Sequence, residues 1–282
     1  VIIGDPEQCI VGFSDYNNDG KQDIIYENAI YRNNYPQFIK RAASFDFLDN
    51  FLSADINGDL NQDIISGSKL FIKNGSSFNE SSLSVYPFTF GSSGATGDLD
   101  NDGDPDINIA GSDPGNYQNY LLKNNGNNSF TEVLHNMRKA VGGGLMMGDY
   151  DNDGYSDILI NGYSGNEITK LYRNKGNMLF EEVIFPFLGL ASNSAQFGDI
   201  DNDNDLDIIL CGSNNGTGGK SLTIYYNNNA NKNAPPAMPA GLSAQSNGYG
   251  IKLNWISATD DHTPVKSLTY NVRVGTSALR TN

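Results

Sequence analysis

The chain has 282 residues, and 33 acidic residues against 18 basic ones give it a formal net charge of −15. Nucleic-acid binding requires clustered Lys and Arg to neutralise phosphates, so this balance argues against a nucleic-acid partner. No run of about twenty apolar residues is present, and we therefore expect no membrane span.

An aspartate-rich pattern, Asp-x-Asp/Asn-x-Asp-x-x-x-Asp, occurs five times, and the first residues of successive copies are 40, 43, 51 and 50 positions apart. Such side chains converge when the chain curls tightly, and they repel one another unless a cation lies between them. Hard oxygen ligands suit Ca²⁺, whereas the lack of Cys and His in the loops argues against zinc or copper. The copies contain Asp15, Asn17, Asp19 and Asp23; Asp55, Asn57, Asp59 and Asp63; Asp98, Asp100, Asp102 and Asp106; Asp149, Asp151, Asp153 and Asp157; and Asp199, Asp201, Asp203 and Asp207.

Position six of the pattern carries residues that enter the left-handed backbone region readily, as a sharp ligand loop requires. These are Gly20, Gly103, Gly154 and Asn204. The second copy has Leu60 there, so we expect its loop to be distorted or to bind more weakly.

An EF-hand would need a bidentate Glu at position twelve and a helix on each side of the loop. None of the five copies has Glu at position twelve, and short β-branched runs follow position nine instead. Such runs, bounded by Gly and Ser, predict strands rather than helices and argue against an EF-hand.

One full period contains four short strands joined by tight turns. In the third copy we expect them at residues 93–97, 106–110, 120–124 and 130–133, and the same order recurs in the other copies. Four strands in each repeat of this length are typical of a β-propeller blade, which must stack on its neighbours to bury both faces. The sequence therefore predicts an all-β chain built on a β-propeller of four-stranded blades.

The fifth repeat lacks a fourth strand, while a strand is expected ahead of the first repeat, at residues 1–3. Either this strand completes the fifth blade and closes the ring, or it ends an earlier blade of a longer protein. Cys9 and Cys211 would lie in neighbouring blades of a closed ring. They either pair as a disulfide or remain two buried free thiols.

The strand, aspartate loop and strand unit resembles the FG-GAP or VCBS-type repeat of integrin alpha-chain propellers and secreted bacterial surface proteins. Residues 148–160 match that pattern at every defining position, and the resemblance covers about residues 10–228. It implies up to five structural Ca²⁺ ions, held by positions one, three, five and nine and by the backbone carbonyl at position seven. Position seven is Lys21, Asn61, Asp104, Tyr155 and Asp205. Because propellers of this family commonly have seven blades, the resemblance favours a fragment of a longer protein.

The composition agrees with calcium loops, because twenty of the 33 acidic residues lie inside the five copies. Five bound Ca²⁺ ions would reduce the net charge from −15 to −5. Most of the acidity is therefore accounted for by metal ligands.

The predicted propeller, residues 1–228, is followed by an Asn- and Pro-rich linker at residues 229–239. Residues 240–282 resemble the first half of a fibronectin type III domain, with a Trp on an early strand and a Tyr-x-Val strand later. Such a sandwich needs about seven strands, and only three are expected before residue 282, so the β-sandwich is partial.

We expect a non-catalytic, calcium-binding protein of the cell surface or extracellular space that binds a glycan or protein ligand in adhesion. Extracellular calcium is high enough to fill weak sites, whereas cytosolic calcium is not. No catalytic triad or metal-hydrolase spacing is present, and an Asp held by Ca²⁺ stays ionised and cannot donate a proton. Two alternatives stay open: the propeller part of a secreted polysaccharide lyase, and a structural component of a larger surface assembly.

Overall fold

The computed structural model describes residues 11–26, 29–42, 51–66, 68–75, 77–83, 90–113, 116–214, 219–230, 234–246 and 250–263, with the single residues 265, 268, 270 and 272. Every regular element in these ranges is a β-strand, which confirms the all-β class. No helix of the described residues is long and apolar enough to cross a membrane. The strand predicted at residues 1–3 and Cys9 lie outside the described ranges.

Five consecutive antiparallel sheets form the blades, in each of which neighbouring strands follow chain order. The first blade contains β1 (Val11–Ser14), β2 (Asp23–Tyr26), β3 (Ala29–Asn34) and β4 (Gln37–Ala42). The second contains β5 (Leu52–Ala54), β6 (Asp63–Ser66), β7 (Lys69–Asn74) and β8 (Ser77–Ser82). The third contains β9 (Phe90–Gly97), β10 (Asp106–Asp113), β11 (Asn116–Asn124) and β12 (Phe130–Val133).

The fourth blade contains β13 (Leu145–Gly148), β14 (Asp157–Tyr163), β15 (Glu167–Asn174) and β16 (Phe180–Val183). The fifth contains β17 (Ala191–Gly198), β18 (Asp207–Asn214) and β19 (Gly219–Tyr225). Within the described residues no fourth strand pairs with β19, as the sequence predicted.

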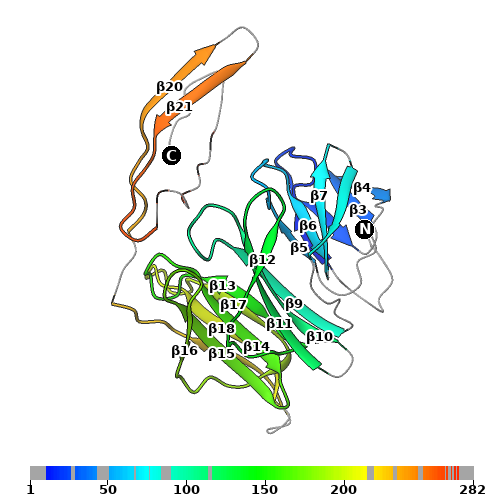
Figure 1. Cartoon of the computed structure of the whole chain (residues 1–282), viewed down its shortest axis with the longest axis vertical. Helices are drawn as coiled ribbons and strands as arrows, with labels where there is room; N and C mark the ends of the chain where they lie inside the picture. The colour runs from blue at the N-terminus through cyan, green and yellow to red at the C-terminus, as the bar shows by residue number, and fades with distance from the viewer. Residues whose placement is uncertain are drawn as a thin grey trace.

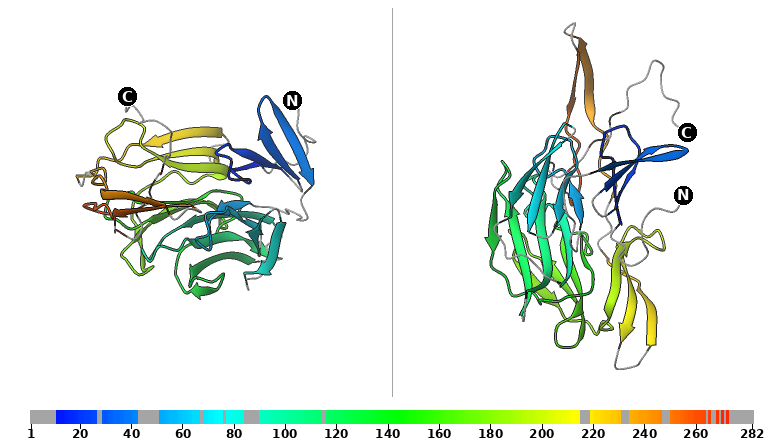
Figure 2. Two further views of the ribbon diagram at one scale, coloured as in Figure 1. Left: turned by 90° about the horizontal axis from the view of Figure 1, so that it is seen from above. Right: turned by 90° about the vertical axis from the view of Figure 1, so that its right-hand side faces the viewer.

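The blades follow one another in chain order around a shared centre (Figure 2, left view). Their first strands are the innermost, because β1 contacts β5, β5 contacts β9, β9 contacts β13, and β13 contacts β17. This confirms the predicted propeller, of which the described residues form five blades.

The apolar core lies between blades rather than within any one of them. Between the third and fourth blades, Leu99 and Leu121 pack in one cluster with Ile158, Tyr172 and Phe180. Because the middle sheets have a neighbour on both faces, second strands such as β14 are apolar on both sides and buried along almost their whole length. This explains why the sequence shows continuous β-branched runs instead of alternation.

Cys211 lies on β18 and is exposed, so the expectation of a buried thiol is wrong for this residue. Leu210 packs in the cluster between the fourth and fifth blades, and the next residue, Cys211, faces the opposite side of the sheet because side chains alternate along a strand. Pairing with Cys9 falls outside the described residues.

The C-terminal segment forms a hairpin of β20 (Ala240–Ser246) and β21 (Ile251–Ile256) that extends away from the blades (Figure 1). The ring centroids of Trp255 and Tyr270 are 5.4 Å apart, and the Tyr270 hydroxyl accepts a hydrogen bond from Ala258 N–H. The hairpin agrees with two strands of the fibronectin-like prediction. The third predicted strand lies largely outside the described residues, so the sandwich itself stays a prediction.

Candidate metal-binding loops

Each aspartate loop connects the first and second strands of its blade and closes on its own first carboxylate. In the fourth loop, Asp149 Oδ1 accepts a hydrogen bond from Asp153 N–H at 3.0 Å, and Oδ2 accepts one from Gly154 N–H at 2.8 Å. The same pair of bonds recurs in the other loops. The chain must reverse within these few residues, so positions four and six have positive φ in every loop.

The second loop keeps these hydrogen bonds although Leu60 occupies position six. Leu60 takes a φ of 68° and its side chain is exposed. The expected distortion is therefore absent from the hydrogen bonds of the loop. The cost lies in the backbone, since a residue with a Cβ in the left-handed region loses about 1–2 kcal/mol.

The carboxylate at position nine lies at the bottom of each loop, and its residue is fully buried in all five blades. Asp157 accepts hydrogen bonds from Tyr150 N–H at 2.9 Å and from Asn174 N–H at 2.7 Å. It thereby joins the start of its loop to the third strand of its blade. Asp23, Asp63, Asp106 and Asp207 make the equivalent two bonds.

Three loops bring carboxylate oxygens within 4.8 Å of one another. The groups are Asp98, Asp100 and Asp106; Asp149, Asp151 and Asp157; and Asp199, Asp201 and Asp203. The structure thus gathers positions one, three and nine in the third and fourth loops, and positions one, three and five in the fifth. The first two loops have Asn17 and Asn57 at position three, which supply one neutral oxygen in place of a carboxylate.

Position three gives the clearest test of whether a cation fits. Oδ1 of Asn17, Asp100 and Asp151 is buried and has no hydrogen-bond partner. A buried acceptor without a partner costs about 1–3 kcal/mol, and more when it is charged. Oxygen atoms that lack donors and lie beside further carboxylates suit Ca²⁺, which takes six to eight oxygen ligands. The residues of these loops therefore fit the ion that the sequence implied.

Burial also makes these carboxylates poor anions in the absence of a cation. It raises the pKa of Asp157 to about 8, that of Asp106 to about 7 and that of Asp63 to about 6. Burial likewise raises the pKa values of Asp149 and Asp151, and neighbouring carboxylates add to the effect. A divalent ion would reverse these shifts, because it favours the charged form of every ligand.

Basic side chains from the third strand partly neutralise two loops. Arg173 Nε lies 2.6 Å from Asp151 and its terminal nitrogen 2.8 Å from Asp153. Lys123 contacts Asp100 and lies 2.9 Å from Asp102 in the third loop. In the fifth blade the equivalent residue is Tyr226, so the loop of the last blade has no such cation at that position.

At position seven the backbone N–H groups donate to the position-five carboxylate in every loop, at 2.8–3.1 Å. The residues are Lys21, Asn61, Asp104, Tyr155 and Asp205. Ligation by their carbonyl oxygens stays a prediction from the resemblance.

Sequence reasoning missed the residue at position four, which links the first, third and fourth loops to the next blade. Asn152 Nδ2 lies 2.8 Å from Asp205 Oδ1 and 3.3 Å from the carbonyl of Asn204. Asn101 donates to the carbonyl of Gly154 at 2.9 Å, and Asn18 makes the same type of contact to the second loop. The recurrence of Asn at position four was the available signal.

A second missed set lies at the end of the third strand. Asn174 Nδ2 donates to the carbonyl of Leu99 in the preceding blade at 2.7 Å, and to Ser156 in its own loop at 3.1 Å. Asn124 and Asn227 make the same inter-blade bond, to Ile56 and Tyr150 respectively. In the second blade Lys73 holds the position of Asn174, because its N–H donates to the position-nine carboxylate in the same way. Its ammonium lies 5.0 Å from the centroid of the Tyr16 ring in the first blade.

Up-and-down blades that carry an aspartate loop between their first two strands define an aspartate-loop β-propeller. Two overlapping segments, residues 98–160 and 149–210, match the family model of the FG-GAP-like repeat. The third, fourth and fifth blades therefore carry FG-GAP-like repeats, which confirms the resemblance for residues 98–210. For the first two blades the resemblance stays a prediction from the sequence.

Among solved structures, the chain is similar to the V. cholerae biofilm matrix protein Bap1, with 12% identity and a TM-score of 0.32. The match covers 88% of this chain and 48% of that one, so the chain spans about half the length of that protein. Comparison with curated proteins finds no match.

Proposed function

We propose that the chain is the calcium-stabilised propeller of an extracellular or cell-surface protein that binds a glycan or protein ligand. The observation that carries the calcium part is the buried, unpartnered oxygen at position three of three loops. In the third and fourth loops it lies beside carboxylates whose pKa values are raised by burial. A divalent cation would supply the missing partner of the oxygen and would favour the charged form of these carboxylates. Calcium is abundant outside the cell, so an extracellular protein would have all of its loops filled.

The ions would have a structural role. In every loop the position-nine carboxylate is bonded to the third strand, and in the first, third and fourth loops the position-four amide is bonded to the next loop. A cation that holds the loop would therefore also hold two strands of one blade and the edge of its neighbour. The loops would form one rim of the propeller with a fixed shape, suited to contact a ligand.

The test of the calcium proposal is a titration of the chelated full chain with Ca²⁺, followed by native mass spectrometry and thermal unfolding. We expect up to five bound ions and a rise in Tm, since one ion at a hundredfold excess over its Kd stabilises by ~2.7 kcal/mol. Mg²⁺ is the matched control and should bind less well, because it demands stricter geometry. An unchanged Tm and no bound ion in millimolar Ca²⁺ would refute the proposal.

The ligand part is tested separately with a glycan array and a panel of extracellular matrix proteins, each probed with and without chelator. We expect binding that disappears when Ca²⁺ is removed. Binding that is equal with and without chelator would place the ligand site away from the loops. Absence of any ligand together with stable co-purification of other proteins would favour an assembly component instead.

We further propose that the chain is non-catalytic, because the acidic groups able to transfer protons are those that would hold the ions. Incubation with pectin-type polymers, with absorbance of the unsaturated product as the readout, tests this. Calcium-dependent turnover would overturn it and favour the lyase alternative.

A further inference from the structure

The fourth aspartate loop is contacted by a turn of the C-terminal segment, at residues 260–263. A Cβ atom on Gly154, at position six of this loop, would overlap the carbonyl oxygen of His262 and lie 2.8 Å from its carbonyl carbon. Only glycine allows another backbone to approach this closely. At Gly20, the equivalent position of the first loop, a Cβ would meet nothing within 4 Å in the described part of the chain. Gly154 therefore serves the contact with the turn as well as the conformation of its own loop.

The turn has a shape that is fixed by hydrogen bonds. Asp260 Oδ1 accepts bonds from the N–H groups of His262 at 2.9 Å and of Thr263 at 2.6 Å. An aspartate that bonds to the backbone two residues later makes a compact turn. The carbonyl of Thr259, just before the turn, accepts a bond from Ala237 N–H in the linker at 2.8 Å. The turn is thus a formed surface that is joined to the linker.

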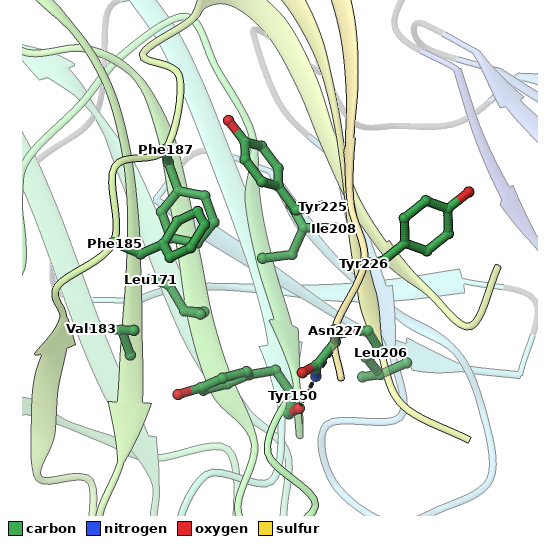
Figure 3. A pocket seen from close by; sticks show the side chains of 10 residues that line it. All are labelled: Tyr150, Leu171, Val183, Phe185, Phe187, Leu206, Ile208, Tyr225, Tyr226 and Asn227. Carbon is green, nitrogen blue, oxygen red and sulfur yellow. Dashed lines mark hydrogen bonds between the residues drawn. The ribbon is translucent and has the colours of Figure 1, made fainter. Parts of the chain in front are cut away.

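The chain that leaves the fifth blade contacts the same loop. Asn227 Nδ2 donates to the carbonyl of Tyr150, at position two, at 2.6 Å (Figure 3). Two residues later, Asn229 Nδ2 donates to the carbonyl of Asp151, at position three. Oδ1 of this aspartate is one of the buried, unpartnered oxygens that fit a cation. The start of the linker and the C-terminal turn therefore contact positions two, three and six of a single loop.

Gly154 also connects this surface to the third blade. Its carbonyl accepts a hydrogen bond from Asn101 Nδ2, at position four of the third loop, at 2.9 Å. One residue thus contacts both the preceding aspartate loop and the C-terminal turn. A shift of the backbone in either loop would therefore reach the turn directly.

We propose that the fourth aspartate loop is the docking surface of the C-terminal module, which comprises β20, β21 and the turn at residues 260–263. We further infer that Ca²⁺ in this loop fixes the position of the module, an inference that rests on the proposed calcium function. Carboxylate oxygens of Asp149, Asp151 and Asp157 lie within 4.8 Å of one another. Such groups repel unless a cation neutralises them, so removal of the ion would shift the backbone that the linker and the turn contact.

The test measures the position of the module on the full chain by electron paramagnetic resonance. Spin labels are attached at Glu132→Cys on β12 and Lys252→Cys on β21, two exposed positions, after Cys9 and Cys211 are replaced by Ser. With Ca²⁺ present, we expect a narrow distribution of distances between the labels. A broad distribution would mean that the module is not docked and would overturn the proposal.

Two pairs of variants separate docking from damage to the fold. Gly154→Ala should broaden the distribution, whereas Gly20→Ala should leave it narrow. Both glycines have positive φ, 87° and 81°, so alanine strains both loops to a similar degree. Asn229→Ala, which removes a side-chain bond and leaves the loop backbone unchanged, should broaden the distribution more than substitution of the exposed neighbour, Asn228→Ala. Equal distributions within both pairs would overturn the docking surface.

Chelation tests the coupling to calcium, with bound ions counted by native mass spectrometry. We expect the distribution of the chain with both glycines intact to broaden in chelator and to narrow again when Ca²⁺ is restored. Ions that bind without any change in the label distances would overturn the coupling and leave the calcium proposal standing. Absence of bound ions would overturn both, while the variant pairs would still decide whether the loop is the docking surface.

Discussion

Asn174→Ala should be among the most destabilising single substitutions in the propeller, because it removes a link between two blades. The fully buried side chain donates to the carbonyls of Leu99 and Ser156, and its Oδ1 accepts a hydrogen bond from Gly176 N–H at 3.0 Å. Alanine leaves all three backbone groups without this partner. Each such buried group costs about 1–3 kcal/mol, so the expected loss of unfolding free energy is at least roughly 3 kcal/mol.

The chain supplies a matched control for this substitution. Asn33 holds the same position in the first blade, which has no preceding blade in the described structure, and it donates to the carbonyl of Gln22 at 3.1 Å. Asn33→Ala should cost about 1 kcal/mol or less, because this bond is partly exposed to water. Denaturant unfolding in saturating Ca²⁺ measures both values. A loss below about 1 kcal/mol for Asn174→Ala, or equal losses for both variants, would show that inter-blade amides do not hold the propeller together.

The remaining predictions concern the loops. In chelator, the raised pKa of Asp157, about 8 against 3.8, means that the folded protein holds a proton which the unfolded chain releases. Tm should then fall as pH rises from 4 to 8, whereas stabilisation by Ca²⁺ should grow with pH; parallel curves would contradict this. Asp153→Ala should weaken calcium binding, measured by calorimetry, more than Asp59→Ala does, because the second loop already carries a strained residue; equal losses would refute the ranking. Asn152→Ala removes the hydrogen bond to Asp205 and should lower Tm by about 2–4 °C for each kcal/mol of unfolding free energy that it costs. Asn202 is exposed in the last blade, so Asn202→Ala should leave Tm unchanged.

Much of the loop was determined by the sequence alone, because its ligands lie within nine residues of one another. Alternating Asp residues, with Gly or Asn at position six, can converge only through a tight turn, and the observed φ angles show that turn in all five copies. The repeat length and the four apolar runs in each period likewise implied blades that must stack. Local chemistry and periodicity were sufficient for these features.

The second loop shows where local reasoning went too far. Leu60 was expected to distort the loop or to weaken its binding, and the hydrogen bonds of Asp55 to the backbone are the same as elsewhere. Weaker binding by this loop stays a prediction. Two such bonds offset the strain of one residue in the left-handed region, so the geometry persists at some cost in stability.

The tertiary structure alone decided which groups meet across blades. Asn152 and Asn174 look like ordinary turn residues, and their partners are 53 and 75 positions away in the chain. The depth of burial that raises the pKa of Asp157, and the contact of Arg173 with two loop carboxylates, also arise only when sheets stack. Ligand pattern is thus a property of a few consecutive residues. Desolvation, counter-charge and inter-blade bonding depend on neighbours that folding brings from distant repeats.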